Sequence, residues 1–277
     1  LQVLHPGGAV GCRGGQGAPL PEVQQLAVGA VLADAGRHAS GWFAGGVAPQ
    51  ARLLAYKASP DAQCGAMSTS AVVAAVEDAL LHRVGADYRL AAINISAGSG
   101  AFTGPCDEIS TLYASAIADA VDLGVTVIAS SGNDGETDAI AAPACFADVL
   151  SVGAYWDQAP GWTGFSFCLD PGCERYCNDS FRPAGSITCY SNVSSYLDLV
   201  APSEYLTTAR AGAQTMDFGG TSGAAPYVAG AVALYREAVP DITPAELRVR
   251  LAMTGRRRVD DRTGLVTPAL RVDRAFL

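Results

Sequence analysis

The sequence has few charged residues and almost no lysine. Charged residues make up 16% of its 277 residues, and Lys57 is the only lysine. Soluble domains usually have about 25% charged residues. Apolar residues reach 49%, which excludes a disordered or polyelectrolyte chain. The net charge of −9 argues against a nucleic-acid partner, because nucleic acids are held through their phosphates by basic side chains.

The sequence also lacks long apolar runs and closely paired metal-binding cysteines. No uninterrupted apolar run reaches the ~18 residues of a membrane span, so we predict no membrane span. Zinc sites favour Cys-x-x-Cys pairs, but there are none, and Cys173 and Cys177 have no nearby histidine. An even number of scattered cysteines instead favours a secreted or extracytoplasmic protein with disulfides. The sequence leaves open how they pair: Cys12, Cys64, Cys106, Cys145, Cys168, Cys173, Cys177 and Cys189.

Strand-like and helix-like runs alternate along most of the chain. The predicted strands are apolar with little alternation, which is typical of a parallel sheet covered on both faces. We therefore predict one α/β domain over residues 1–277, with a doubly wound, mostly parallel sheet and helices on both faces. A disulfide-rich insertion at about 161–189 breaks the pattern. The predicted strands are Arg52–Lys57, Leu90–Ser96, Val125–Ser130 and Val149–Val152, and the predicted helices are Thr69–Val84, Ile109–Leu123, Gly223–Ala238 and Pro244–Thr254.

Two segments have residue types suited to catalysis. Phe218–Gly230 places Ser222 between a Gly-Gly-Thr turn and a helix of small residues. There the helix dipole and N–H groups favour developing negative charge, although an ordinary helix N-cap explains the serine equally well. Gly124–Gly135 is a buried strand that ends in a Gly-Asn-Asp-Gly turn. Asn133 in that turn is either a donor to an oxyanion or simply a turn residue.

Together these segments resemble the subtilases, the subtilisin-like serine peptidases. GGTSGAAPYVAG is similar to the family's GTSMAAPHVAG nucleophile motif, and VTVIASSGNDG is similar to its VVVVAAAGNEG oxyanion strand. Further motifs follow in family order at residues 46–58, 91–100 and 191–204. The resemblance covers roughly residues 20–277 and implies a subtilisin-like fold.

The resemblance also implies roles for individual residues. Ser222 falls on the nucleophile and Asn133 on the oxyanion donor. An extended peptide or protein segment would bind by adding a strand to an edge of the sheet. The residues that fall on this edge strand are Ser96, Ala97 and Gly98, and those on the wall of the primary specificity pocket are Ser130, Ser131 and Gly132.

The sequence departs from the family at the catalytic base. Where the family has HGTHVAG, this chain has Val23–Gly29, so Val23 occupies the histidine position. Valine cannot accept a proton. The family's aspartate should end an early strand, and the nearest candidate slot holds His5, unless the chain begins beyond it. Because serine is a poor nucleophile without a base, we expect weak catalysis or none.

Three other groups are alternative candidates for the base. His38 precedes the GVAP motif, but using it would delete the central helix of the fold. His5 would approach from the aspartate side, where the family's aspartate reaches the serine only through the histidine. Glu22 is similar to the base of the sedolisin relatives, which would need an aspartate where this chain has Leu26.

Cofactor and function follow from the same residues. Ala35–Gly46 lacks the Asn- and Asp-rich composition of the family's calcium loop, so we predict no metal at that site and no cofactor. A different calcium site at Asp134, Asp138 and Asp148 stays open, although acidic surface loops explain these residues better. Three functions stay open. The first is an exported pseudoprotease that binds extended peptide or protein segments. The second is a working serine endopeptidase with a non-standard base, and the third is a structural subunit whose cleft binds nothing.

Overall fold

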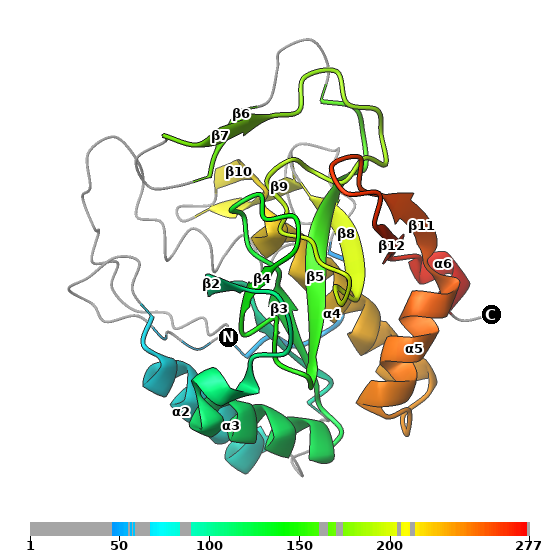
Figure 1. The fold of residues 1–277 in the computed structure, drawn as a ribbon. Coiled ribbons are helices and arrows are strands. Elements are labelled where there is room, and N and C mark those ends of the chain that lie inside the picture. The colour runs from blue at the N-terminus through cyan, green and yellow to red at the C-terminus, as the bar shows by residue number, and fades with distance from the viewer. Residues whose placement is uncertain are drawn as a thin grey trace.

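A central six-stranded sheet organises the chain (Figure 1). The computed structural model describes residues 46–54, 56, 58, 67–83, 90–160, 166–169, 174–203, 206–210 and 214–275. Neighbouring strands are parallel except for the last pair, β12 and β11, which is antiparallel. This confirms the predicted mostly parallel α/β sheet. Its strands, in spatial order, are β1 (Ala92–Ile95), β3 (Thr126–Ser130), β5 (Val149–Trp156), β8 (Leu199–Ser203), β12 (Val266–Ala269) and β11 (Arg256–Val259).

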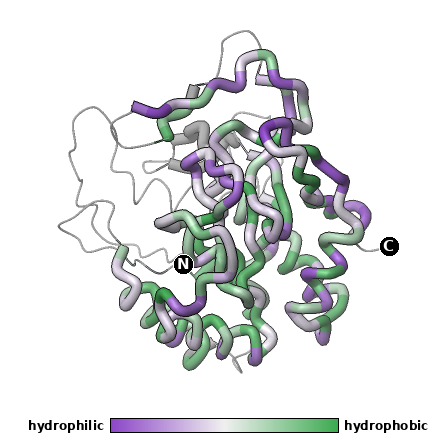
Figure 2. The backbone as a smooth tube through the Cα atoms, in the orientation of Figure 1, coloured by the Kyte–Doolittle hydropathy of each residue, from purple (hydrophilic) through white to green (hydrophobic). Residues whose placement is uncertain are grey.

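Both faces of the sheet are covered, and its central strands β3 and β5 are mostly apolar and buried at every position. Successive side chains of a strand point to opposite faces. Val127 accordingly packs in the core cluster that contains helices α2 (Thr69–Arg83) and α3 (Thr111–Asp122). Ile128 packs in the cluster that contains helices α4 (Thr221–Ala238) and α5 (Pro244–Thr254). In Figure 2 the central strands are mostly hydrophobic, and the hydrophilic stretches lie mainly in the outer loops.

Local side chains set the helix boundaries. The Thr243 hydroxyl accepts the Glu246 N–H at 3.2 Å, and Glu246 Oε2 accepts the Thr243 N–H at 2.9 Å. Both bonds stabilise the start of α5. The Thr243 hydroxyl also donates to Glu246 Oε2 at 2.7 Å, and the bonds from the Thr243 N–H and hydroxyl lower the pKa of Glu246 below its ordinary value. Pro244 follows this cap, and α5 has the bounds that the sequence predicts. Helix α4 begins at Thr221, two residues before its predicted start, so Ser222 lies in its first turn.

Some predicted elements differ from the observed ones. Residues 52–54 and 56 form no strand, and Arg52 and Leu53 are exposed, so this run lacks the burial of a central strand. Strands β8, β11 and β12 were not predicted. Short elements complete the described chain: β2 (Ser99–Phe102), η1 (Asp107–Ile109), β4 (Ile140–Ala142), β6 (Ser166–Cys168), β7 (Tyr176–Asn178), β9 (Leu206–Arg210), β10 (Gln214–Phe218) and α6 (Val272–Ala275). β2 pairs with β4, β6 with β7 and β9 with β10, each pair antiparallel.

Disulfides are present, as the cysteine count predicts. Cys106 pairs with Cys145 and Cys177 pairs with Cys189. Cys168 is disulfide-bonded as well, and there is no free cysteine among the described residues. Cys173 and Cys177 could instead have been zinc ligands, but Cys177 forms a disulfide with Cys189, so the zinc interpretation is wrong for this residue. Within the ranges given above, no helix has the length and apolar character needed to cross a membrane.

Candidate active site

Three predicted site residues lie at one end of the sheet. Ser96 follows the carboxyl end of β1, and Asn133 lies just beyond the carboxyl end of the neighbouring strand β3. Ser222 is the second residue of α4, which packs against both strands. In parallel α/β sheets, functional sites form at this edge, because the connecting loops bring residues from several strands together there.

The candidate nucleophile is tied to the edge of the sheet through both its side chain and its backbone. The Ser222 hydroxyl donates to the Ser96 carbonyl at 3.3 Å, and the Ser96 hydroxyl donates to the Ser222 carbonyl at 2.9 Å. In a regular helix the residue four positions later would donate to that carbonyl, but here that residue is Pro226, which has no N–H. The Ser96 hydroxyl takes its place, and Asn94 Nδ2 donates to the same hydroxyl at 2.9 Å.

Asn133 is held by its carbonyl oxygen. Oδ1 accepts hydrogen bonds from the Thr221 N–H and the Thr221 hydroxyl, both at 2.9 Å. The amide nitrogen is therefore the atom that can donate to a substrate oxygen. Gly220 keeps this region open, because it has φ +76° and a Cβ there would lie 3.2 Å from Asn133 Nδ2. The geometry suits the oxyanion donor that the sequence predicts.

The two predicted binding segments approach each other at Ala141. A Cβ on Gly98 would lie 3.0 Å from the Ala141 methyl, and one on Gly132 would lie 3.2 Å from it. Ser130 is buried at the end of β3. Ser131 is also buried, and its hydroxyl donates to the Asn192 carbonyl at 2.9 Å. Ala97 is half-buried beside the exposed Gly98.

Two residues of this site, Ala141 and Asn192, were not predicted from the sequence. Asn192 is fully buried, and its Oδ1 accepts the backbone N–H groups of Asp134 at 2.9 Å and of Glu136 at 3.0 Å. Its own N–H donates to the Gly132 carbonyl at 3.0 Å. Both residues act through contacts between distant segments. Asn192 lies in the motif at residues 191–204, but that motif gives its side chain no role, and no local pattern marks Ala141.

Several predictions fall outside the described residues. These are Val23 in the histidine position, His5 in the aspartate slot, and the alternative bases His38 and Glu22. Almost all of the candidate calcium loop Ala35–Gly46 also falls there. In the described part of the chain, no group of three or more His, Cys, Asp or Glu side chains could hold a metal ion.

Comparison with known families decides the relationship. The sequence profile of the subtilase family matches residues 26–266. The chain belongs to the subtilase family. Among related proteins, this subtilase is 28% identical over 208 residues to an extracellular serine proteinase of a Thermus species, covering 74% of this chain and 42% of the relative. It is 33% identical over 172 residues to an extracellular protease of Xanthomonas campestris, covering 59% of this chain and 24% of the relative.

Further similarities support the subtilase fold. Subtilisin NAT of Bacillus subtilis subsp. natto is 30% identical over 212 residues, which covers 76% of this chain and 45% of the relative. The chain thus spans less than half the length of these three relatives. A cold-adapted subtilisin-like serine proteinase has a TM-score of 0.67 at 21% identity, covering 91% of this chain and 76% of that one. The prenylagaramide maturation protease PagA has a TM-score of 0.66 at 23% identity, covering 92% and 81%.

Tyr227, on the same helix as Ser222, should make the stability of this subtilase depend on pH. Burial raises the pKa of Tyr227 to about 12 from 10.0, and the Asp157 and Tyr155 charges add to the shift. Because the folded state keeps this proton longer than the unfolded state, stability should fall as the pH rises from 10 to 12. In Tyr227→Phe, urea unfolding midpoints should fall less steeply over this range. Tyr176→Phe, at an exposed position, is the control and should follow the wild type.

Proposed function

We propose that this subtilase is an exported protein that binds extended peptide or protein segments and hydrolyses peptide bonds far more slowly than an intact family member. The observation that carries the proposal is Val23, which occupies the position of the family's catalytic histidine and cannot accept a proton. Serine is a poor nucleophile unless a general base takes up the proton of its hydroxyl.

Peptide binding is supported by the edge of the sheet. Within the described residues, β1 is an outer strand of the six-stranded sheet, and the chain beyond it is exposed at Gly98 and Ser99. A peptide added alongside residues 96–98 would gain main-chain hydrogen bonds. Its side chain would point between Gly98 and Gly132, where the Ala141 methyl lies. We therefore propose a preference for small side chains at that position of the peptide.

Export is supported by two kinds of observation. The described residues include the disulfides Cys106–Cys145 and Cys177–Cys189, and disulfides persist mainly in oxidising compartments. The relatives from Thermus and Xanthomonas are both named extracellular.

A working endopeptidase is the second candidate function. It is favoured by the intact contacts between Asn133 and Thr221 beside Ser222, which would serve catalysis if another group supplied the base. The names of the relatives, which are proteinases and proteases, favour it too. A structural subunit with an empty cleft is the third possibility.

Capture of Ser222 by a fluorophosphonate probe separates the first two functions. A positioned base is worth about 10²–10⁴ in rate, so capture should be slower than in an active subtilisin by a factor of this order. Casein hydrolysis should be correspondingly weak, and Ser222→Ala gives the background of both assays. Capture at the rate of an active subtilisin, with casein turnover that Ser222→Ala abolishes, would establish the endopeptidase instead. If no member of a peptide library shifts the backbone amide resonances of residues 96–98, the structural subunit is favoured.

A further inference from the structure

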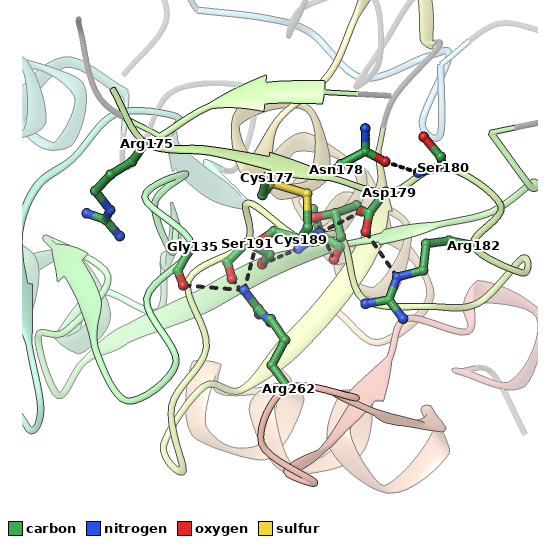
Figure 3. Close-up of a disulfide and its surroundings, with 12 residues drawn as sticks. Gly135, Arg175, Cys177, Asn178, Asp179, Ser180, Arg182, Cys189, Ser191 and Arg262 are labelled. Carbon is green, nitrogen blue, oxygen red and sulfur yellow. Dashed lines mark hydrogen bonds and ion pairs between the residues drawn. A yellow bond between two sulfur atoms is a disulfide. The ribbon is translucent and has the colours of Figure 1, made fainter. Parts of the chain in front are cut away.

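Arg262 lies in the turn between β11 and β12, far along the chain from the candidate active site. Its guanidinium has five N–H donors, and each has an acceptor. On one side Nε and Nη2 donate to the two carboxylate oxygens of Asp260, at 3.0 and 2.8 Å. On the other side Nη2 donates to the Ser191 carbonyl at 2.8 Å, and Nη1 to the carbonyls of Cys189 at 2.7 Å and Gly135 at 3.5 Å. Figure 3 shows the bonds of Arg262 to the backbone carbonyls beside the Cys177–Cys189 disulfide.

The three carbonyls belong to two segments: the turn that contains Asn133, and the segment 189–192 that is hydrogen-bonded to this turn. Gly135 ends the turn that contains Asn133, and its N–H donates to the Tyr190 carbonyl at 2.8 Å. Cys189 and Ser191 flank that tyrosine in the second segment. The next residue, Asn192, holds the turn through the N–H groups of residues 134 and 136. Arg262 therefore fastens both segments at one point.

The acidic partner of Arg262 keeps the guanidinium in place. The Asp260 side chain is 2% exposed and that of Arg262 is 20% exposed, so water screens the pair only weakly. The Arg262 N–H also donates to Asp260 Oδ1 at 2.8 Å. A planar fork held in this way can bond several fixed carbonyls at once, whereas the ammonium group of lysine has three donors and no fixed plane.

We propose that Arg262 is a positioning residue for the oxyanion donor: it fixes the turn 132–136, and through it the amide of Asn133. The inference rests on the proposed role of Asn133 in the site. It assigns a function in positioning Asn133 to a side chain that bonds the turn at Gly135, from 127 residues further along the chain.

The test compares Arg262→Lys with a matched control, Arg248→Lys. Arg248 also forms a bidentate ion pair, with Asp198, and donates to the carbonyls of Ala147 and Val149, but it does not touch the turn 132–136. Two readouts are compared at equal folded fraction. Amide hydrogen exchange of residues 134–136 should become at least tenfold faster in Arg262→Lys, with strand β3 unchanged. Fluorophosphonate capture, expressed as a ratio to wild type, should also fall at least tenfold, and both readouts should stay within twofold in Arg248→Lys.

The outcomes separate this inference from the proposed function. The capture ratio does not depend on how fast the wild type reacts, so rapid capture would refute the pseudoprotease but leave this comparison intact. If the wild type is not captured at all, the exchange of residues 134–136 still decides. If Arg262→Lys fails to fold, Asp260→Asn, which keeps the arginine and weakens its anchor, should give a smaller change in the same direction. Exchange in the turn equal to that of the Arg248→Lys control would overturn the inference.

Discussion

Replacing Asp179 by alanine is expected to lower the free energy of unfolding by about 3–5 kcal/mol. The Asp179 side chain is fully buried and accepts three hydrogen bonds. They come from Trp156 Nε1 at 2.8 Å, the Cys189 N–H at 2.6 Å and Arg182 Nε at 3.1 Å. Alanine would remove the carboxylate oxygen that accepts from the first two donors, which are buried, and would deprive Arg182 of its buried partner. Urea denaturation at neutral pH measures the loss.

Asp261→Ala provides the matched control for this prediction. Asp261 pairs with the same arginine, Arg182, but its side chain is 58% exposed. Exposed ion pairs contribute about 0–1 kcal/mol, so this variant should unfold close to the wild-type urea concentration. Equal losses in the two variants would show that Asp179 acts only through the ion pair. In that case the buried donors of Trp156 and Cys189 would be satisfied in another way.

Gly132→Ala is expected to impair the candidate site more than any other single methyl group. Gly132 has φ +107°, which residues with a Cβ rarely adopt, and its Cβ would lie 2.3 Å from Asn192 Nδ2. The new methyl group would push Asn192 away from the turn and displace Asn133. Removing an oxyanion donor costs about 10²–10³ in rate, a loss known from a subtilisin itself. Fluorophosphonate capture should therefore fall by a factor of this order relative to wild type.

The control for Gly132→Ala is Gly104→Ala. A Cβ on Gly104 has no atom within 4 Å, and its backbone is not left-handed, so capture and stability should not change measurably. Hydrogen exchange of residues 134–136 shows whether the turn has moved in Gly132→Ala. Unchanged capture together with unchanged exchange would mean that Asn192 can move aside and that the tight contact at Gly132 does not position Asn133.

Local chemistry explains which elements the sequence could predict. Helix α5 was predicted to its last residue because Thr243, Pro244 and Glu246 make a cap that is complete within four residues. Strand β3 was predicted because a short, mostly apolar run with little alternation is typical of a strand covered on both faces, and every residue of β3 is indeed buried. Strand β11 consists of three arginines and a valine and lies at an edge of the sheet. Its order comes from pairing with β12, which the sequence pattern does not reveal.

The same distinction holds for the site. Ser222 and Asn133 were predicted because short motifs surround them, and their neighbouring elements bring them to one end of the sheet. Asn192, Ala141 and Arg262 act through contacts with segments distant in the sequence, so even the motif at residues 191–204 did not reveal the role of the Asn192 side chain. Arg262 could have been noticed only as one arginine among many. Its three carbonyl partners are known only from the structure, which brings Gly135 next to Cys189 and Ser191.

Pro226 has a mechanical consequence for the serine. Pro226 has no N–H to donate to the Ser222 carbonyl, which accepts the Ser96 hydroxyl instead. The position of Ser222 along the axis of α4 is therefore fixed by a hydrogen bond to the residue that follows strand β1, and not by one to the next helical turn. A slide of α4 along its axis would have to break this link before it could move the serine. A peptide strand that shifted residues 96–98 on docking would carry the hydroxyl with it. Under the proposed function, peptide binding and the alignment of the Ser222 hydroxyl would therefore both depend on the two hydrogen bonds between Ser96 and Ser222.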